Sequence, residues 1–284
     1  MKTLLALAAA LAIAVPGPLL AQAQKKAPSR GPDVIFVPTP QEVVEDMLRL
    51  ANVRKGDVLY DLGSGDGRIA ITAAKKYGIK ATGIDIDPQR IEEATENAKK
   101  AGVSDRVQFR QEDLFQANFR DATVVTLYLL PDLNVKLRPK LWNELKPGTR
   151  IVSHDYPLTG WIPEKYVQMD LEDKVAISGV TTTLIYMYVV PAKVAGSWRA
   201  KMPPALSSQP ATLELRQQLT RITGSVKLNG REVPLQDAKL RGDRLSFKLA
   251  GRKGEFSGQV KGRSIEGTVK TGGAEAPWSA SLGG

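Results

Sequence analysis

The chain has 284 residues, and single domains most often have ~100–150, so we expect two globular units. With 42% hydrophobic and 25% charged residues, it has the composition of an ordinary globular protein with a sizeable core. It contains no cysteine, which excludes disulfides, thiolate metal sites and a cysteine nucleophile. With His154 as its one histidine, a histidine-rich metal site is excluded as well, and we expect no resident metal.

The first 23 residues have the order of a secretory signal peptide. A basic start at Lys2 precedes an apolar run over residues 4–15, a Pro-Gly-Pro break and an Ala-Gln-Ala site. A membrane-spanning helix needs ~20 apolar residues, so this run is too short. We expect cleavage after Ala23, a periplasmic or secreted protein with no transmembrane segment in the mature chain, and a flexible leader over residues 24–32. An uncleaved anchor stays open as an alternative.

Residues 33–192 alternate short apolar runs with helical stretches. The hydroxyl of Thr39, followed by proline and an acidic first turn, predicts a capped helix over residues 40–51. Strands that alternate with helices of ~10–15 residues indicate parallel βαβ units, so the fold class is α/β with a doubly wound, Rossmann-like sheet. The expected strands are residues 58–62, 80–86, 107–111, 122–130, 149–154 and 181–190, and the further helices are 67–77, 88–101 and 134–145.

Residues 196–284 have a different sequence pattern. Strand-like segments recur every eight to twelve residues and are separated by turns such as Asn229-Gly230, which predicts a small antiparallel β domain, either a barrel or a sandwich. Arg241-Gly242-Asp243 is interpreted as a hairpin turn. This part holds fifteen Lys and Arg against seven Asp and Glu, so it carries most of the net charge of +10. Attachment to an anionic envelope surface and a dispersed, solvated charge coat both stay open.

A glycine-rich turn between the first strand of the sheet and the next helix carries the clearest signal. Glycines there let the backbone approach a ligand, and the helix N-terminus presents free N–H groups. The dinucleotide pattern G-x-G-x-x-G is not matched, because Arg68 stands where its last glycine would be. The predicted loop residues are Asp61, Gly63, Ser64, Gly65 and Gly67.

Acidic residues follow three successive strands of the predicted sheet. Asp61 suits a cationic partner, such as the α-ammonium of a methionine moiety. Asp85 stands about twenty residues beyond the glycines, where an acid accepts hydrogen bonds from ribose hydroxyls. Asp66 and Asp87 suit helix caps. At the adenine end, a carboxylate would accept from the exocyclic amine while apolar side chains hold the ring, and the candidates are Ile86, Glu112, Asp113 and Leu114.

These motifs resemble the class I, seven-stranded S-adenosylmethionine-dependent methyltransferases. Further strings resemble one branch, the archaeal broad-specificity protein-lysine methyltransferases and their mitochondrial relatives: Phe36-Val37-Pro38-Thr39-Pro40, Tyr128-Leu129-Leu130-Pro131, Ser153-His154-Asp155-Tyr156 and Gly160-Trp161. The resemblance covers about residues 33–190 and implies S-adenosyl-L-methionine as cofactor and a protein substrate with an accessible lysine. It also implies that Phe36, Val37 and Thr39 close over the cofactor. The leader and the β domain depart from the branch.

The candidate catalytic residues are Tyr128, Asp155 and Tyr156. The two tyrosines stand at the ends of neighbouring strands, where their rings could line a desolvating channel that favours a neutral amine and steadies a cationic one. Asp155 could attract the incoming ammonium. His154 is interpreted as a structural hydrogen-bonding residue rather than a base.

Two other interpretations stay open. The acceptor of the methyl group could be a small molecule, or the chain could be an exported, non-catalytic scaffold that kept the fold. Amino methylation of nucleic acid is disfavoured, because Tyr128-Leu129-Leu130-Pro131 stands where such enzymes carry an Asn/Asp-Pro-Pro-Tyr/Phe motif.

Overall fold

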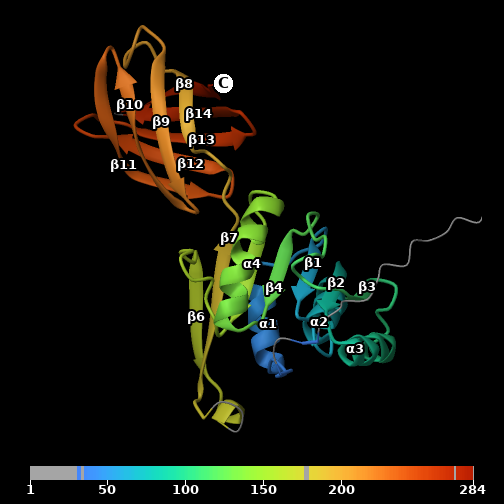
Figure 1. Cartoon of the computed structure of the whole chain (residues 1–284). Coiled ribbons are helices and arrows are strands. Elements are labelled where there is room, and N and C mark those ends of the chain that lie inside the picture. Colours follow the sequence, from blue (N-terminus) through green and yellow to red (C-terminus); the bar gives the residue numbers. More distant parts are fainter. Residues whose placement is uncertain (1–30, 33–34, 176–178, 272, 284) are drawn as a thin grey trace, which may run out of the picture.

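The computed structural model describes residues 31–32, 35–175, 179–271 and 273–283 (Figure 1). The predicted signal peptide and most of the predicted leader therefore lie outside the described residues. The described chain forms an α/β sheet with its helices, followed by a separate β barrel.

The α/β unit is built on a seven-stranded sheet in the order β3-β2-β1-β4-β5-β7-β6. The first five strands are parallel to one another, while β7 runs antiparallel to both of its neighbours. This arrangement confirms the predicted Rossmann-like sheet and brings the carboxyl ends of the parallel strands to one edge. The strands are β1 (Val58–Leu62), β2 (Lys80–Asp85), β3 (Val107–Gln111), β4 (Val124–Leu127), β5 (Arg150–His154), β6 (Lys165–Asp170) and β7 (Thr182–Val189).

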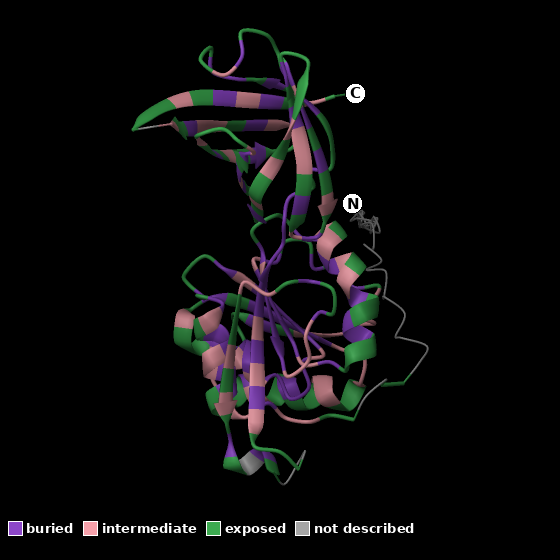
Figure 2. Ribbon diagram, turned by 90° about the vertical axis from the view of Figure 1, so that its left-hand side faces the viewer, coloured by how far each residue is buried: buried purple, intermediate pink, exposed green. Residues whose placement is uncertain are grey.

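Helices cover both faces of the sheet, which is why the central strands β1 and β4 are buried except for the first residue of β1 (Figure 2). On one face, Leu59 and Val124 pack with the apolar residues of α1 (Gln41–Leu50), α2 (Arg68–Tyr77) and α3 (Pro88–Lys100). On the other face, Tyr60 and Val125 pack with α4 (Pro131–Glu144). Neighbouring residues of one strand thus serve opposite cores, as strand geometry requires.

Two helix starts differ from the sequence prediction. Thr39 does not cap α1: its N-cap is Pro40 with no side-chain cap, and the Thr39 hydroxyl lies 3.2 Å from Nδ1 of His154 instead. Helix α4 begins at Pro131, three residues before the predicted start, because a proline at the first helical position has its φ already set and needs no N–H partner.

The hairpin of β6 and β7 contains a strand that the sequence did not predict. Strand β6 lies at the edge of the sheet and buries none of its residues fully, so it lacks an apolar run. The short 3-10 helix η1 (Glu172–Lys174) follows it. Because β7 is antiparallel to β5 and Ile185 pairs with His154, η1 and the first residues of β7 lie at the edge where the parallel strands end.

The C-terminal unit is a closed, antiparallel barrel of eight strands, which decides between the predicted barrel and sandwich. Three aromatic rings pack together in its otherwise largely aliphatic interior: Phe247 stacks on Phe256 at 4.8 Å, and Trp278 meets both edge-on. Gly258 makes room for that indole, since a Cβ there would come within 2.9 Å of Trp278. The strands are β8 (Gly196–Lys201), β9 (Ala211–Gln218), β10 (Arg221–Leu228), β11 (Arg231–Arg241), β12 (Arg244–Leu249), β13 (Glu255–Lys261), β14 (Ser264–Thr271) and β15 (Ala274–Leu282).

Two predicted turns of the barrel are confirmed. Asn229 and Gly230 both have positive φ between β10 and β11, as a two-residue hairpin turn requires. Gly242, at φ +58°, lies in the turn between β11 and β12.

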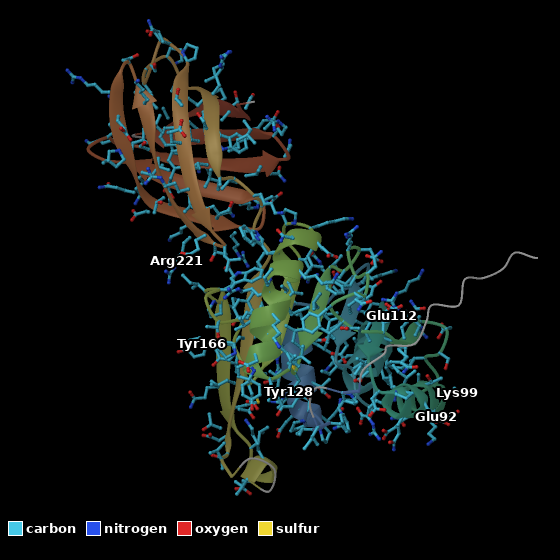
Figure 3. The ribbon with its side chains drawn as sticks, in the orientation of Figure 1. Glu92, Lys99, Glu112, Tyr128, Tyr166 and Arg221 are labelled. Atoms are coloured by element: carbon cyan, nitrogen blue, oxygen red, sulfur yellow. The ribbon has the colours of Figure 1, made fainter. Side chains whose placement is uncertain are left out.

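The barrel packs against the edge of the sheet where β5 begins. The backbone N–H of Ala192 donates to the carbonyl of Gly242 at 2.8 Å, and Arg241 forms an ion pair with Glu164 at 3.0 Å. Leu219, in the hairpin before β10, is buried in the same core as α4, and Figure 3 labels nearby Arg221 at this junction. The barrel thus lies at the edge opposite the carboxyl ends of the parallel strands (Figure 1).

Candidate active site

A cavity opens at the carboxyl ends of β1, β2 and β4, the position where ligands bind in open α/β sheets. The empty space within it, its open mouth included, is about 880 Å³. The cavity brings together eleven of the residues predicted from sequence: Phe36, Val37, Thr39, Asp61, Gly63, Ser64, Asp85, Ile86, Asp113, Leu114 and Tyr128.

The glycine turn is shaped by close packing. Gly65 and Gly67 both have positive φ and do not line the cavity. A Cβ on Gly65 would clash with the ring of Phe36, and one on Gly67 would clash with the ring of Phe109. These two glycines therefore let aromatic rings pack against the turn, while Gly63 borders the cavity itself.

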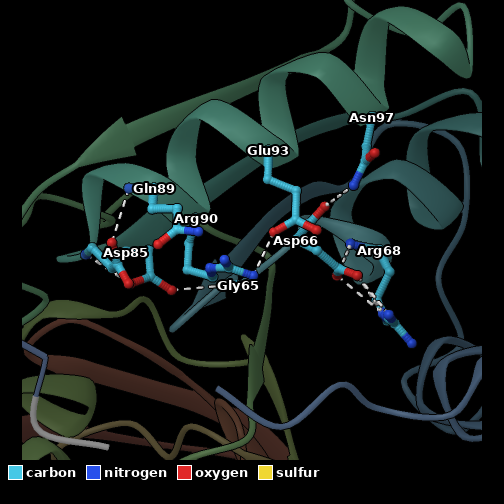
Figure 4. A network of polar contacts seen from close by, with 9 residues as sticks. Gly65, Asp66, Arg68, Asp85, Gln89, Arg90, Glu93 and Asn97 are labelled. Atoms are coloured by element: carbon cyan, nitrogen blue, oxygen red, sulfur yellow. Dashed lines mark hydrogen bonds and ion pairs between the residues drawn. The ribbon is translucent and has the colours of Figure 1, made fainter. Parts of the chain in front are cut away.

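Asp85 is fixed by backbone donors at the end of β2. One carboxylate oxygen accepts from the N–H of Gly65 at 2.9 Å, the other from the N–H of Asp87 at 3.0 Å (Figure 4). Each oxygen keeps a second lone pair for a ligand hydroxyl. Asp87 itself accepts from the N–H of Gln89, which confirms it as the cap of α3.

Asp61 is a buried carboxylate with spare capacity. Its side chain is 2% exposed, and Oδ1 accepts from the Thr126 hydroxyl at 2.7 Å, while Oδ2 has no hydrogen-bond partner among the described residues. Burial raises the pKa of Asp61 to about 7, and the nearby carboxylates Asp85 and Asp66 act in the same direction. A cationic ligand group beside Oδ2 would relieve this desolvation cost, so the site fits an ammonium.

The opposite end of the cavity is less polar. Ile86 and Leu114 line it together with Asp113, whose Oδ1 accepts from the N–H of Phe115 at 2.9 Å. Glu112 does not line the cavity: its backbone N–H donates to the carbonyl of Asp85 at 3.0 Å, and its carboxylate lies 4.0 Å from Arg110.

The segment before α1 covers the cavity. The guanidinium of Arg68 donates to the carbonyl of Thr39 at 2.9 Å, and the guanidinium of Arg90 lies 5.0 Å from the centre of the Phe36 ring. Sequence reasoning singled out neither arginine as a site residue, although Arg68 is conspicuous as the residue that breaks the dinucleotide pattern. The lining residues that it missed are Pro32, Ile35, Asp66, Arg68, Ile69, Asp87, Arg90, Leu129 and Leu133.

Tyr128 connects the cavity to a polar cluster behind it. It lies within the α/β unit (Figure 3), its ring is stacked 6.3 Å from that of Tyr156, and its hydroxyl lies 3.4 Å from Oδ2 of Asp155. Neither Tyr156 nor Asp155 lines the cavity. The three candidate catalytic residues thus lie together, with Tyr128 alone facing the cavity.

His154 is buried next to this cluster, with its ring 4.0 Å from that of Tyr128. Burial lowers the pKa of His154 to about 4; the Asp155 carboxylate opposes this shift and the ammonium of Lys174 adds to it. The imidazole is therefore neutral at pH 7. Burial also raises the pKa of Tyr128, as do the nearby Asp155 and Tyr156, so its phenol keeps its proton.

Comparisons with known proteins agree with this geometry. Residues 61–165 match the family model described as the ANTKMT methyltransferase domain. A protein-lysine N-methyltransferase of Saccharolobus islandicus is 44% identical over 160 residues, which cover 56% of this chain and 95% of the relative. The chain belongs to the class I S-adenosylmethionine-dependent methyltransferases. Within them, this methyltransferase is related to the archaeal and mitochondrial protein-lysine enzymes.

Two further proteins are similar to this chain, one a mouse enzyme and the other a solved bacterial structure. The methyltransferase is 35% identical to the mouse adenine nucleotide translocase lysine N-methyltransferase over 158 residues, covering 55% of this chain and 63% of that protein. A solved structure described as an RNA methyltransferase from Salinibacter ruber in complex with S-adenosyl-L-homocysteine is 51% identical, with a TM-score of 0.50, and covers 56% of this chain and 96% of that one.

The cofactor of this methyltransferase is S-adenosylmethionine, which supplies an electrophilic methyl group on a sulfonium centre. The cavity fits it: Asp61 offers an unpartnered oxygen for its ammonium, Asp85 offers lone pairs for its ribose, and Ile86 and Leu114 are positioned for its adenine. Among the described residues, no group of three or more acidic or histidine side chains could hold a metal ion. None of the described helices combines the length and apolar character needed to cross a membrane.

Because its carboxyl group has a pKa of about 7, Asp61 should couple cofactor binding to proton release. At pH 6, Asp61 of the cofactor-free enzyme is mostly protonated, and the entering ammonium displaces its proton. Binding should therefore release about one proton and weaken about tenfold per pH unit below pH 6. Titration calorimetry in buffers of different ionisation enthalpy measures this release.

The matched variants are Asp61→Asn and Asp105→Asn. Asp61→Asn should bind at least ~10-fold more weakly and release no proton, because the amide does not titrate. Asp105 has a side chain that is 67% exposed, so its variant should behave like the wild type. Proton release that persists in Asp61→Asn would contradict this role.

Proposed function

We propose that this methyltransferase transfers methyl groups to lysine ε-amino groups of proteins. The observation that carries the proposal is the cluster behind the cavity, in which the stacked rings of Tyr128 and Tyr156 stand beside the carboxylate of Asp155. Aromatic faces attract and then desolvate an ammonium, and a carboxylate accepts its hydrogen bond. The names of the archaeal and mouse relatives support the same substrate class.

The transfer is an in-line displacement at the methyl carbon. The lone pair of a neutral amine forms the new N–C bond while the C–S bond breaks, its electron pair stays on sulfur, and the extra proton on nitrogen is lost. The chain has to align the amine and keep it neutral, so positioning supplies most of the rate. A neutral His154 suits this task, because it adds no positive charge against the acceptor.

RNA is the competing acceptor, since the solved structure at 51% identity is described as an RNA methyltransferase. The chain offers less for a flipped base. Tyr128-Leu129-Leu130-Pro131 lacks the Asn/Asp-Pro-Pro-Tyr/Phe motif of amino-methylating nucleic-acid enzymes. The cluster of Tyr128, Tyr156 and Asp155 also contains a carboxylate, which disfavours the approach of a polyanion such as RNA.

We also propose that the enzyme acts outside the cytosol, in the periplasm or as a secreted protein. The support is the order of its first 23 residues, with a basic start, an apolar run and a small-residue cleavage site.

A third proposal concerns the barrel, as a module that attaches the enzyme to an anionic phospholipid surface. Its support is the local excess of basic residues and a shallow groove across β11 to β14 in which Lys239, Arg241 and Arg244 gather. All three side chains are exposed, and Glu266 is the one acidic residue among those that line the groove. Like charges that converge on one strip raise the local potential.

Incubation of the mature chain with S-adenosylmethionine and a cell protein extract, followed by peptide mass spectrometry, should find methyl groups on lysine side chains. Tyr128→Ala should lower this activity ~100-fold, because the acceptor loses its channel wall. Tyr166→Ala is the matched control, since Tyr166 is 66% exposed on β6. Methyl groups found in an RNA extract or on free small molecules, with none on lysine, would overturn the proposal.

Expression of the full chain in a bacterium should give a mature protein that begins at Gln24 in the non-cytosolic fraction. Leu11→Arg should keep the chain in the cytosol with its leader intact, because a charge interrupts the apolar run. Ser29→Ala, beyond the predicted cleavage site, should leave export unchanged. N-terminal mass spectrometry distinguishes these outcomes, and an uncleaved wild type in the cytosol would rule out export.

Sedimentation with vesicles tests the barrel. The wild type should bind vesicles that contain an anionic phospholipid and release them as salt is raised, with little binding to neutral vesicles. The pair Lys239→Gln and Arg244→Gln should weaken binding at least ~5-fold, since each basic residue near an anionic surface contributes ~1 kcal/mol. The charge-matched pair Lys99→Gln and Lys100→Gln on α3 should leave vesicle binding unchanged. An equal loss of binding in both double variants would favour a dispersed charge coat.

A further inference from the structure

The short helix η1, between β6 and β7, reaches the acceptor side of the site. Lys174, the last residue of η1, is 7% exposed, and its ammonium lies 2.7 Å from Oδ1 of Asp155. It also donates to the backbone carbonyl of Thr182 at 2.5 Å. The neighbouring side chains Val175 and Val180 are about half exposed, whereas Lys174 is buried.

A buried lysine in such a segment calls for a reason beyond stability. Removing two charges from water costs free energy that their attraction often fails to recover, so a buried ion pair is poor evidence for a stabilising role. Tyr128 lies between this pair and the cavity. The second oxygen of Asp155 is 3.4 Å from the hydroxyl of Tyr128, which faces the cavity.

The backbone at Asp155 is held in a strained turn. Asp155 has a φ of +57°, and the N–H of Tyr156 donates to the carbonyl of His154 at 2.7 Å, which closes a tight three-residue turn of a rare kind. Such conformations persist where the surroundings fix them, and they concentrate at functional sites. Here β7 fixes the turn, since Leu184 both accepts from the N–H of Asp155 at 2.7 Å and donates to its Oδ1 at 3.2 Å.

The two oxygens of Asp155 therefore have different surroundings. Oδ1 is occupied by Lys174 and by the N–H of Leu184. Oδ2 faces the hydroxyl of Tyr128 and lies 3.5 Å from Nε2 of His154, a distance too long for a good hydrogen bond. The carboxylate is thus anchored on one side and keeps lone pairs on the side of the acceptor channel.

We propose that Lys174 is a positioning residue for methyl transfer: it anchors Asp155 by Oδ1, aims Oδ2 at the acceptor, and neutralises the carboxylate so that the acceptor lysine loses its proton. This role rests on the lysine substrate proposed above. It assigns a function to the β6–β7 hairpin, which supplies the ammonium that pairs with Asp155.

The charge of the pair explains why both residues are needed. A lone carboxylate beside the acceptor would stabilise its ammonium form and raise its pKa above the ordinary ~10.4, which withholds the lone pair needed for attack. Paired with Lys174, Asp155 still accepts a hydrogen bond but adds no net negative charge. The cationic neighbour also disfavours a second ammonium nearby, as a lysine next to another cation is activated.

The titratable groups around the pair come from every element packed on it. His154 ends β5 and Asp155 follows it, Tyr128 follows β4, and the backbone carbonyl of Thr182 belongs to β7. Burial raises the pKa of Tyr186 on β7, and the Asp155 carboxylate adds to this effect. Among the described residues, the titratable groups near Asp155 and Lys174 include His154, Tyr128, Tyr156 and Tyr186.

The chain's one histidine gives a test that needs no acceptor. His154 lies beside Asp155, and its imidazole gives an isolated NMR signal whose titration reports the local charge. Lys174→Met removes a cation that lowers the pKa of His154, so this pKa should rise by about one unit from its value near 4. Lys174→Arg, which keeps the charge, should titrate like the wild type. An unchanged or lowered His154 pKa in a folded Lys174→Met variant overturns the role.

The pH profile of kcat supplies the second readout. In Lys174→Met, the limb that rises with pH should move to higher pH by about one unit, because the acceptor amine holds its proton more tightly, and Lys174→Arg should restore it. Lys165→Met, an exposed lysine of the same hairpin, is the control. If Lys174→Met lowers kcat but leaves the rising limb of the pH profile at the same pH, Lys174 has only a structural role and the inference is overturned. If wild type methylates no protein lysine, the proposed function fails, and the His154 titration alone decides whether Lys174 governs the charge at Asp155.

Discussion

A carboxylate buried at the end of β1 is the constraint around which the cofactor side of the site is arranged. Asp61 has lost most of its contact with water, and one of its oxygens finds no partner among the described residues. Burial of such a carboxylate costs free energy until a cationic group binds beside it. The cavity therefore favours a ligand with a cationic group, whatever the shape of that ligand. The glycine turn and Asp85 then fix where the rest of the ligand lies, because both are locked to the same strand ends.

The two ends of the site use the same type of side chain for opposite purposes. Asp61 has no basic partner among the described residues, so it favours a ligand ammonium that keeps its proton. Asp155 is paired with Lys174, so it can receive an ammonium that has to give its proton up. The difference comes from neighbours rather than from the carboxyl group, which is how one fold assigns acid and base roles at a single pH. Methyl transfer to an amine needs both behaviours within one active site.

The sequence predicts the cofactor side better than the acceptor side, for a physical reason. Asp61, Asp85 and Asp113 each follow a buried strand directly, so local pattern and topology suffice to bring them together. Lys174 comes from a hairpin whose first strand exposes most of its residues, and nothing local marks its burial. Thr39 carries a convincing cap pattern, yet its hydroxyl faces His154, 115 residues away. Strands β8, β11 and β15 are not predicted either, although the turns on either side of β11 are.

The barrel lies at one end of the molecule and the cavity at the other, since the contacts of Gly242 and Leu219 are made where β5 begins. The barrel thus contributes no wall to the catalytic chamber and cannot select acceptors by touching them there. An enzyme fastened through its barrel would carry its catalytic cavity at the opposite end of the sheet from the junction with the barrel. The cavity would then receive lysines of proteins outside the layer to which the barrel is attached more readily than lysines within that layer.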